Sequence, residues 1–206
     1  MNIIRQIVPP LNVNCYILAD EKTKNCIVID AGGGYDVVMQ TTDSLGYKIM
    51  GAAFTHGHYD HALDGHKFKE NGVPVYITQK DEELLQGRGN LARYCGVKMQ
   101  PFTADGYLSE GDNEIGEFKF KVLFTPGHTA GSCCFLFGDT LFCGDTLFKG
   151  NYGRCDFPSG SMEDMKKSVF GKLFLLPVGT VLYPGHGEPT TIGDEIKDNP
   201  INDYKD

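Results

Sequence analysis

Five of the six histidines of this 206-residue chain lie in three short motifs that contain glycine. The segment THGHYDH, residues 55–61, holds His56, His58 and His61, whereas His128 and His186 each follow a Pro-Gly pair. A histidine in an ordinary core needs no particular neighbours, but metal ligands must converge from loops that tight turns hold in place. The pattern therefore predicts a metal centre assembled from several loops.

Seven side chains make up the predicted ligand set, which adds two aspartates to the five histidines: His56, His58, Asp60, His61, His128, Asp145 and His186. In a compact turn, alternate histidines of the first motif can point towards one metal while the adjacent pair Asp60-His61 points towards a second. His128 can complete the first centre and His186 the second, and Asp145 is placed to bridge them. Imidazole and carboxylate ligands suit two zinc ions, with iron or manganese as alternatives, at a typical spacing of ~3.5–4 Å.

Such a centre predicts hydrolytic chemistry. A water held between two metal ions loses a proton readily, with a pKa near ~7 by analogy with zinc-bound water, and the resulting hydroxide is the expected nucleophile. One ion can polarise a substrate carbonyl while the other stabilises the leaving group. The carboxylates of Asp60 and Asp145 are the predicted catalytic residues, and no Ser-His or Cys-His pair is required.

Composition limits the class of protein. With 41% hydrophobic and 22% charged residues, the chain can bury a sizeable core, and its length predicts a single domain over residues 1–206. A formal charge of −8 argues against a nucleic-acid partner, and no apolar stretch reaches membrane-spanning length. The seven cysteines form no disulfide framework, which favours a reducing compartment. We therefore expect a cytoplasmic protein that acts on a small molecule.

The ligand motifs follow predicted strands. We expect strands over residues 3–8, 15–19, 26–30, 49–54, 75–78, 115–124, 133–137, 140–143 and 180–183, and helices over residues 35–45, 62–71, 80–85 and 162–176. Residues 87–101 are predicted to form a loop or lid. Antiparallel strands interleaved with helices favour an α/β fold in which two sheets pack face to face with helices outside, the ligands lying along one edge.

The motifs resemble those of a known superfamily. HGHYDH at residues 56–61 resembles the HxHxDH signature of the metallo-β-lactamase fold superfamily. Four further motifs fit in the expected order: VIDAG at 28–32, GHTAGS at 127–132, GDTLF at 144–148 and PGHG at 184–187. The resemblance implies a four-layer αββα sandwich of two mixed β-sheets with two bound metals.

Within that superfamily the chain most resembles glyoxalase II-like proteins, the hydroxyacylglutathione hydrolases. The segments GRCDFP, residues 153–158, and TTIGDE, residues 190–195, are similar to the short bacterial branch. This resemblance implies hydrolysis of a thiolester such as S-(2-hydroxyacyl)glutathione. It also implies a ligand assignment, with His56, His58 and His128 on metal 1, Asp60, His61 and His186 on metal 2, and Asp145 between them.

The residues that contact the substrate are less clearly marked. Full-length glyoxalase II enzymes carry a C-terminal helical region whose basic residues grip the glutathione carboxylate, whereas here the twenty residues after His186 are mostly acidic or neutral. The resemblance therefore extends to the chemistry and leaves the thiol carrier open. Tyr152 and Arg154, in a glycine-flanked loop after Asp145, are candidates for substrate contact, and pairing with a structural carboxylate is the alternative role of Arg154.

Two other reactions remain open on the same motifs. A persulfide dioxygenase of the superfamily uses one iron, held by the counterparts of His56, His128 and Asp145, and a lactone or ester hydrolase uses the same metals with a more apolar pocket. The PGHG ending favours the hydrolase over the dioxygenase. Asp30 has two interpretations, since it either orients the ligand loop or caps a turn. Cys133 and Cys134 are expected to be inert, buried thiols.

Overall fold

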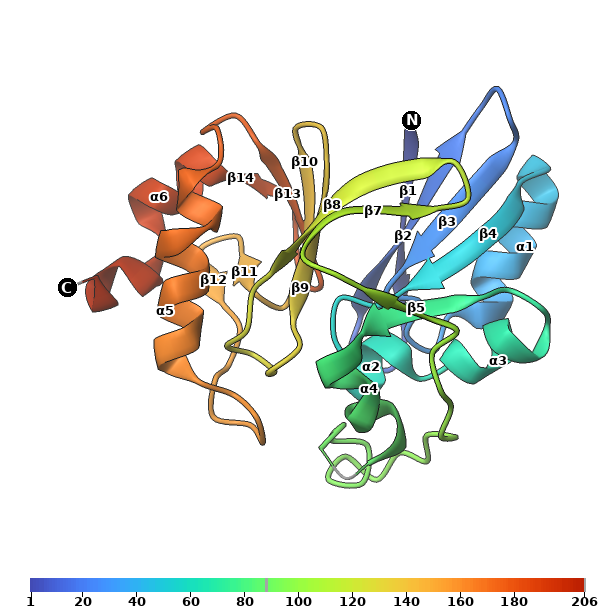
Figure 1. Cartoon of the computed structure of the whole chain (residues 1–206), viewed down its shortest axis with the longest axis horizontal. Coiled ribbons are helices and arrows are strands. Elements are labelled where there is room, and N and C mark those ends of the chain that lie inside the picture. The colour runs from blue at the N-terminus through green and yellow to red at the C-terminus, as the bar shows by residue number, and fades with distance from the viewer. Residues whose placement is uncertain (88, 206) are drawn as a thin grey trace. The chain divides into compact units, whose positions relative to one another are not determined.

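The computed structural model describes residues 1–87 and 89–205, which divide into two compact units (Figure 1). The first unit comprises Met1–Leu108 and Glu114–Phe118, and the second comprises Ser109–Asn113 and the chain from Lys119 onwards. Each unit has its own six-stranded sheet and its own helices. That residues 1–206 fold as a single domain stays a prediction.

The sheet of the first unit is mixed. Its strands lie in sequence order: β1 (Asn2–Val8), β2 (Val13–Asp20), β3 (Asn25–Ile29), β4 (Lys48–Ala53), β5 (Val75–Thr78) and β6 (Gly106–Leu108). β1 to β3 are antiparallel neighbours, whereas β3 to β6 are parallel. Parallel neighbours need crossover connections, and these contain α1 (Tyr35–Leu45), α2 (Tyr59–Ala62), α3 (Gly65–Glu70) and α4 (Gln79–Gln86).

Helices α1 and α3 cover one face of this sheet, side by side in Figure 1. Their inward side chains Val38 and Phe68 are fully buried in the core of the unit, and the ring of Tyr35 meets Phe68 edge-on at 4.9 Å. Helix α1 ends at Gly46, whose φ of 70° is the left-handed conformation that favours glycine at a C-terminal cap. The predicted helix over 35–45 is confirmed.

The sheet of the second unit is also mixed. In spatial order its strands are β14 (Thr190–Thr191), β13 (Val181–Pro184), β10 (Thr140–Gly144), β9 (Cys133–Phe137), β8 (Phe118–Phe124) and β7 (Gly111–Ile115). β10 and β13 are parallel, and the pairs β8–β9, β9–β10 and β13–β14 are antiparallel. A separate hairpin joins β11 (Leu147–Phe148) to β12 (Asn151–Tyr152). Helix α5 (Met162–Gly171) buries Met165 and Val169 against this sheet.

Two mixed sheets with helices confirm the predicted α/β class, but three predicted elements differ in extent. The single strand predicted over 115–124 is wrong, because the chain turns at Gly116, with φ 59°, between β7 and β8. The helix predicted over 62–71 is shorter and corresponds to α3, because residues 63–64 separate α3 from α2, which ends at Ala62. The helix predicted over 162–176 ends at Gly171 and is followed by a 3-10 turn, Leu173–Leu175.

The polar C-terminal tail is ordered around one buried carboxylate. Helix α6 (Ile192–Asp198) places Glu195 in the interior of the second unit, where its carboxylate accepts hydrogen bonds from Thr190 Oγ1 (2.6 Å), Asn199 Nδ2 (2.6 Å) and Gly150 N (2.9 Å). Asn199 in turn donates to the backbone oxygen of Asn151 at 2.8 Å. The tail therefore holds the turn between β11 and β12.

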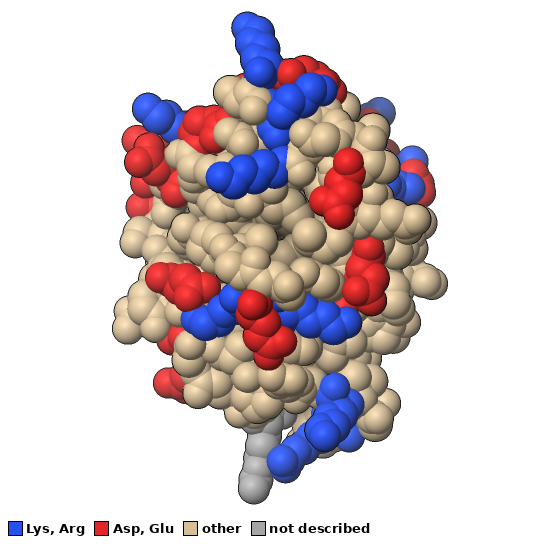
Figure 2. Space-filling model, turned by 90° about the vertical axis from the view of Figure 1, so that its right-hand side faces the viewer, with Lys and Arg blue, Asp and Glu red and all other residues tan. Residues whose placement is uncertain are grey.

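Among the residues that the structure describes, no helix is long and apolar enough to cross a bilayer. Figure 2 shows acidic and basic side chains interspersed with large uncharged areas over most of the face it presents. Basic side chains lie together at the lower end of that face, on the part of the first unit where Figure 1 shows residues 89–101, and basic side chains also gather at its upper end, beside acidic ones.

We predict that Glu195→Ala lowers the free energy of unfolding by about 3 kcal/mol, because two buried donors and one partly buried donor lose a charged acceptor. Asp198→Ala, at an exposed position of the same helix, should change it by less than about 0.5 kcal/mol. Urea denaturation in the presence of a chelator measures both, since the chelator removes any contribution of bound metal. Equal effects of the two variants would contradict the assigned role of Glu195.

Candidate metal centre

The first group of predicted ligands lies in the loop that follows β4. His56, His58, Asp60 and His61 are all buried, and α2 begins directly after His58. Ligand atoms of three pairs lie within 4.8 Å of one another, namely His56 with His58, His56 with His61, and Asp60 with His61. The structure therefore brings together the four predicted ligands of the first unit.

Asp30 holds this loop in place. Its Oδ1 accepts the backbone N–H of Thr55 at 2.8 Å, and its Oδ2 accepts the Thr55 hydroxyl at 2.7 Å and lies 3.0 Å from His61 Nδ1. A carboxylate next to one imidazole nitrogen fixes the ring orientation and leaves the other nitrogen for a metal. Of the two interpretations of Asp30, the structure supports the one in which it orients the ligand loop.

Glycine at position 57 lets α4 pack directly on the ligand loop. A Cβ added there would lie 2.7 Å from the backbone oxygen of Asp81 and 2.7 Å from Leu84 Cβ, which is closer than real contacts allow. The Gly57 N–H donates to the carboxylate of Asp81, a buried residue, at 2.9 Å. The sequence analysis missed Asp81, whose signal is an acidic residue in the first turn of a helix that follows a strand.

The second group of predicted ligands lies in the second unit. His128 Nε2 and His186 Nε2 each lie 3.6 Å from Asp145 Oδ2. His128 Nδ1 is 2.7 Å from the backbone oxygen of Arg154. Because a carbonyl oxygen can only accept, Nδ1 carries the proton, and Nε2 has the lone pair that a metal requires.

Gly153 is what allows this close approach. A Cβ at position 153 would lie 1.8 Å from the backbone oxygen of Asp145 and 3.3 Å from His128 Nδ1. Any larger residue would push the 153–154 backbone away from both ligands. The glycine of the GRCDFP segment is therefore explained by the packing of the second ligand group.

The donor set fits a divalent metal of borderline hardness. Five imidazoles and two carboxylates are typical ligands of zinc, iron and manganese. The buried thiols do not compete, because a thiol binds metal as the thiolate and burial raises the pKa of Cys134 to about 11 and that of Cys143 well above its usual value. The expected burial of Cys133 and Cys134 is confirmed. That all seven ligands share one centre with two metals stays a prediction.

The two candidates for substrate contact have partners in the second unit. Arg154 forms a two-pronged ion pair with the exposed Asp156, with Nε and Nη2 at 2.9 and 2.8 Å from its two carboxylate oxygens. Tyr152 packs against the core of the unit, with its ring centroid 6.3 Å from that of Tyr204. The pairing of Arg154 with a structural carboxylate was one of its two interpretations, and substrate contact by either residue stays a prediction.

Comparisons with known proteins agree on one family. A model described as the metallo-beta-lactamase superfamily matches residues 8–186. The hydroxyacylglutathione hydrolase GloC of Haemophilus influenzae is 33% identical, with 100% of both chains covered. Two crystal structures are similar over almost their whole length. The BLEG-1 B3 metallo-beta-lactamase has a TM-score of 0.90 at 29% identity, covering 97% of this chain and 98% of that one. TTHA1623 in a di-iron-bound form has a TM-score of 0.86 at 30% identity, covering 96% and 98%.

We predict that Asp30→Asn weakens zinc binding by about 10- to 100-fold, as is usual when a hydrogen-bond partner of a ligand is lost. Both oxygens of the carboxylate accept hydrogen bonds, whereas an amide accepts at one oxygen and donates from its NH₂ group. The asparagine would therefore face one of the present donors with another donor. Competition with a chromophoric chelator measures the affinity. Asp43→Asn, on the exposed surface of α1, is the matched control and should bind zinc as the wild type does. Wild-type affinity in Asp30→Asn would show that this carboxylate does not orient the ligands.

Proposed function

Because the chain belongs to the metallo-β-lactamase superfamily and has its fold, we propose that this metal-dependent hydrolase cleaves acyl-thioesters to an acid and a thiol. S-(2-Hydroxyacyl)glutathione is the representative substrate, on the strength of the full-length similarity to a hydroxyacylglutathione hydrolase. The observation that carries the proposal is the intact ligand set, present as two groups that hydrogen-bond partners hold in place.

We assign the seven ligands to two metals, with His56, His58 and His128 on the first, Asp60, His61 and His186 on the second, and Asp145 between them. The position of Asp145 supports this assignment. Its Oδ2 is 3.6 Å from the Nε2 atoms of both His128 and His186, the two histidines of the second unit that are assigned to different metals. A carboxylate equidistant from both can serve both. Zinc is the first choice, and iron is a real alternative because a structural relative has a di-iron form.

Bound divalent ions supply Lewis acidity, which activates water near neutral pH and polarises the thioester carbonyl. Within the chain, the carboxylates of Asp60 and Asp145 offset the positive charge of the centre. The carboxylate of Asp30 beside His61 Nδ1 and the carbonyl of Arg154 beside His128 Nδ1 fix the orientation of the two rings and leave each Nε2 for a metal. The leaving group is a thiolate, whose conjugate acid has a pKa of about 8.5, so departure does not need a general acid.

We predict that the purified, metal-loaded protein hydrolyses S-D-lactoylglutathione, that a chelator abolishes turnover, and that zinc, iron or manganese restores it. Metal analysis of the same sample should give two ions per chain. Negligible turnover with two metals bound would exclude glutathione thioesters and direct the search to other thioesters, lactones and esters. A single iron per chain would instead favour the persulfide dioxygenase.

We predict that Asp145→Ala loses metal and hydrolysis together, with kcat/KM lower by more than about 100-fold, because loss of a mere partner of a ligand already costs up to that factor. Asp139→Ala, at an exposed residue in the turn before β10, is the control and should retain both. Full activity in Asp145→Ala would show that the assignment to two bridged metals is wrong.

A further inference from the structure

The first unit contains a cavity of about 820 Å³ between the end of α4 and residues 89–101. Its volume lies in the range of pockets that enclose small molecules. Leu85, Val97 and Met99 contribute apolar surface, and Arg93 and Lys98 contribute positive charge. The cavity thus suits a molecule with both an apolar stretch and an anionic group.

The segment that forms the cavity is joined to the ligand loop by a backbone hydrogen bond. The carbonyl of Asn90 accepts the N–H of Tyr59, the residue between His58 and Asp60, at 3.0 Å. Asn90 is itself buried, with its Oδ1 accepting the Ala92 N–H at 3.2 Å and its Nδ2 donating to the Met99 sulfur at 3.3 Å. One residue therefore lines the cavity and also contacts the ligand loop.

The two cations of the cavity are available to a ligand. Both Arg93 and Lys98 are exposed, and neither pairs with a carboxylate among the residues that the structure describes. Lys69 of the same unit, by contrast, is paired with Asp105 at 2.6 Å. The basic lower end of the face in Figure 2 coincides with this segment. In a chain of net charge −8, a local excess of positive charge next to a reaction centre favours an anionic substrate.

We infer that this cavity binds the thiol carrier of the substrate, with Arg93 and Lys98 holding an anionic group of the carrier. The inference rests on the proposed function and specifies its substrate as a thioester of an anionic carrier. The acyl group would lie at the ligand loop, and the carrier would extend along Asn90 into the cavity, its methylene groups against Val97 and Met99. The anion is either a carboxylate, as in glutathione, or a phosphate, as in coenzyme A.

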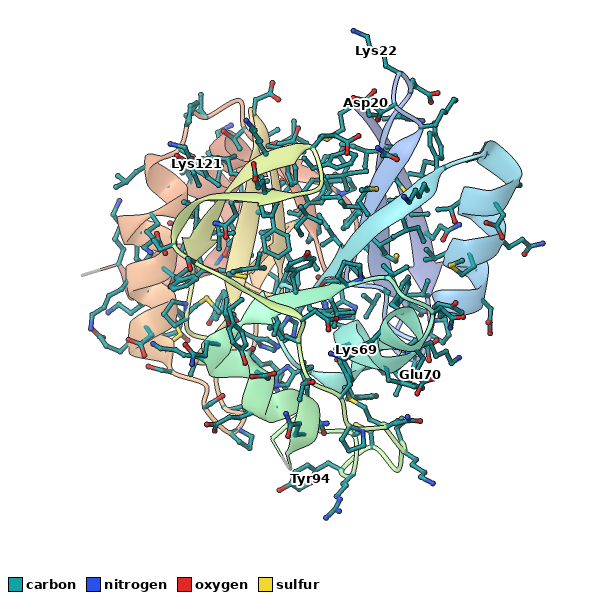
Figure 3. The ribbon with its side chains drawn as sticks, turned by 45° about the vertical axis from the view of Figure 1, so that its right-hand side comes forward. Asp20, Lys22, Lys69, Glu70, Tyr94 and Lys121 are labelled. Atoms are coloured by element: carbon teal, nitrogen blue, oxygen red, sulfur yellow. The ribbon has the colours of Figure 1, made fainter. Side chains whose placement is uncertain are left out.

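The test removes both charges in the double variant Arg93→Gln/Lys98→Gln. The control, Lys22→Gln/Lys48→Gln, removes the same net charge at the far end of the unit, where Lys22 lies opposite Tyr94 of the segment in Figure 3. Lys22 lies in the turn between β2 and β3. Lys48 is next to this turn, since its N–H donates to the backbone oxygen of Lys24 at 2.8 Å. The substrates are lactoyl thioesters of glutathione, of coenzyme A and of the neutral thiol N-acetylcysteamine.

For the carrier that the cavity accepts, the first double variant should raise KM about tenfold with kcat within about twofold, since each lost exposed ion pair is worth a factor of up to about five. KM for the neutral thioester should not change, and the control should behave as the wild type does. The carrier with the larger KM change identifies the anion as carboxylate or phosphate. An unchanged KM for both anionic thioesters, or an equal rise for all three, would overturn the inference.

A binding measurement separates this inference from the proposed function. S-Methylglutathione and S-methyl-coenzyme A are thioethers that cannot be hydrolysed, and isothermal titration calorimetry reports their affinity without turnover. One of them should bind the wild type and bind Arg93→Gln/Lys98→Gln about tenfold more weakly. Such binding without hydrolysis of any thioester would refute the proposed reaction and keep the binding site. Hydrolysis without any loss of affinity in the variant would refute the site and keep the reaction.

Discussion

The metal ligands of the first unit depend on the buried carboxylate of Asp30. The ligand loop begins where β4 ends, so the backbone hydrogen bonds of the sheet no longer fix it, and its buried polar groups need other partners. β3 and β4 are parallel, with Ile29 opposite Ala53, and parallel strands end at the same edge of a sheet. Asp30 therefore follows β3 at the point where Thr55 follows β4. Its φ of 52° is costly for a residue other than glycine, and the three polar contacts offset that cost.

The second unit orients its ligands through the backbone instead of a carboxylate. The carbonyl of Arg154 does for His128 what the carboxylate of Asp30 does for His61, since each oxygen lies next to Nδ1 and leaves Nε2 for a metal. The backbone can come this close only because Gly153 has no side chain. The C-terminal tail also stabilises this region, because the carboxylate of Glu195 accepts the N–H of Gly150 in the turn of the hairpin. The two ligand groups thus use different structural devices for the same chemical purpose.

The sequence predicted most of this arrangement where function imposes a residue type. Imidazoles and carboxylates in glycine-rich turns are recognisable without coordinates, and so are the helix over 35–45 and its terminal Gly46. The failures have physical causes. Residues 115–124 read as one strand because apolar side chains continue on both sides of Gly116, and only the left-handed turn at that glycine divides them. Asn90 gave no signal because it contacts the ligand loop through a carbonyl oxygen, which every residue has.

The same reasoning explains why substrate choice is harder to read from the sequence than reaction class. The reaction depends on ligands that must be His or Asp, whereas an anionic carrier needs only positive charge near an apolar surface, and many arrangements supply that. Sequence alone cannot tell a paired cation from an available one. Arg154 follows the ligand Asp145 and is the natural candidate, but its guanidinium is taken up by Asp156. Arg93 and Lys98 lie in a segment without periodicity, and their importance is visible only once the fold closes that segment into a cavity next to the ligand loop. Specificity of this kind is expected of irregular segments, which can change while the scaffold and the metal ligands stay fixed.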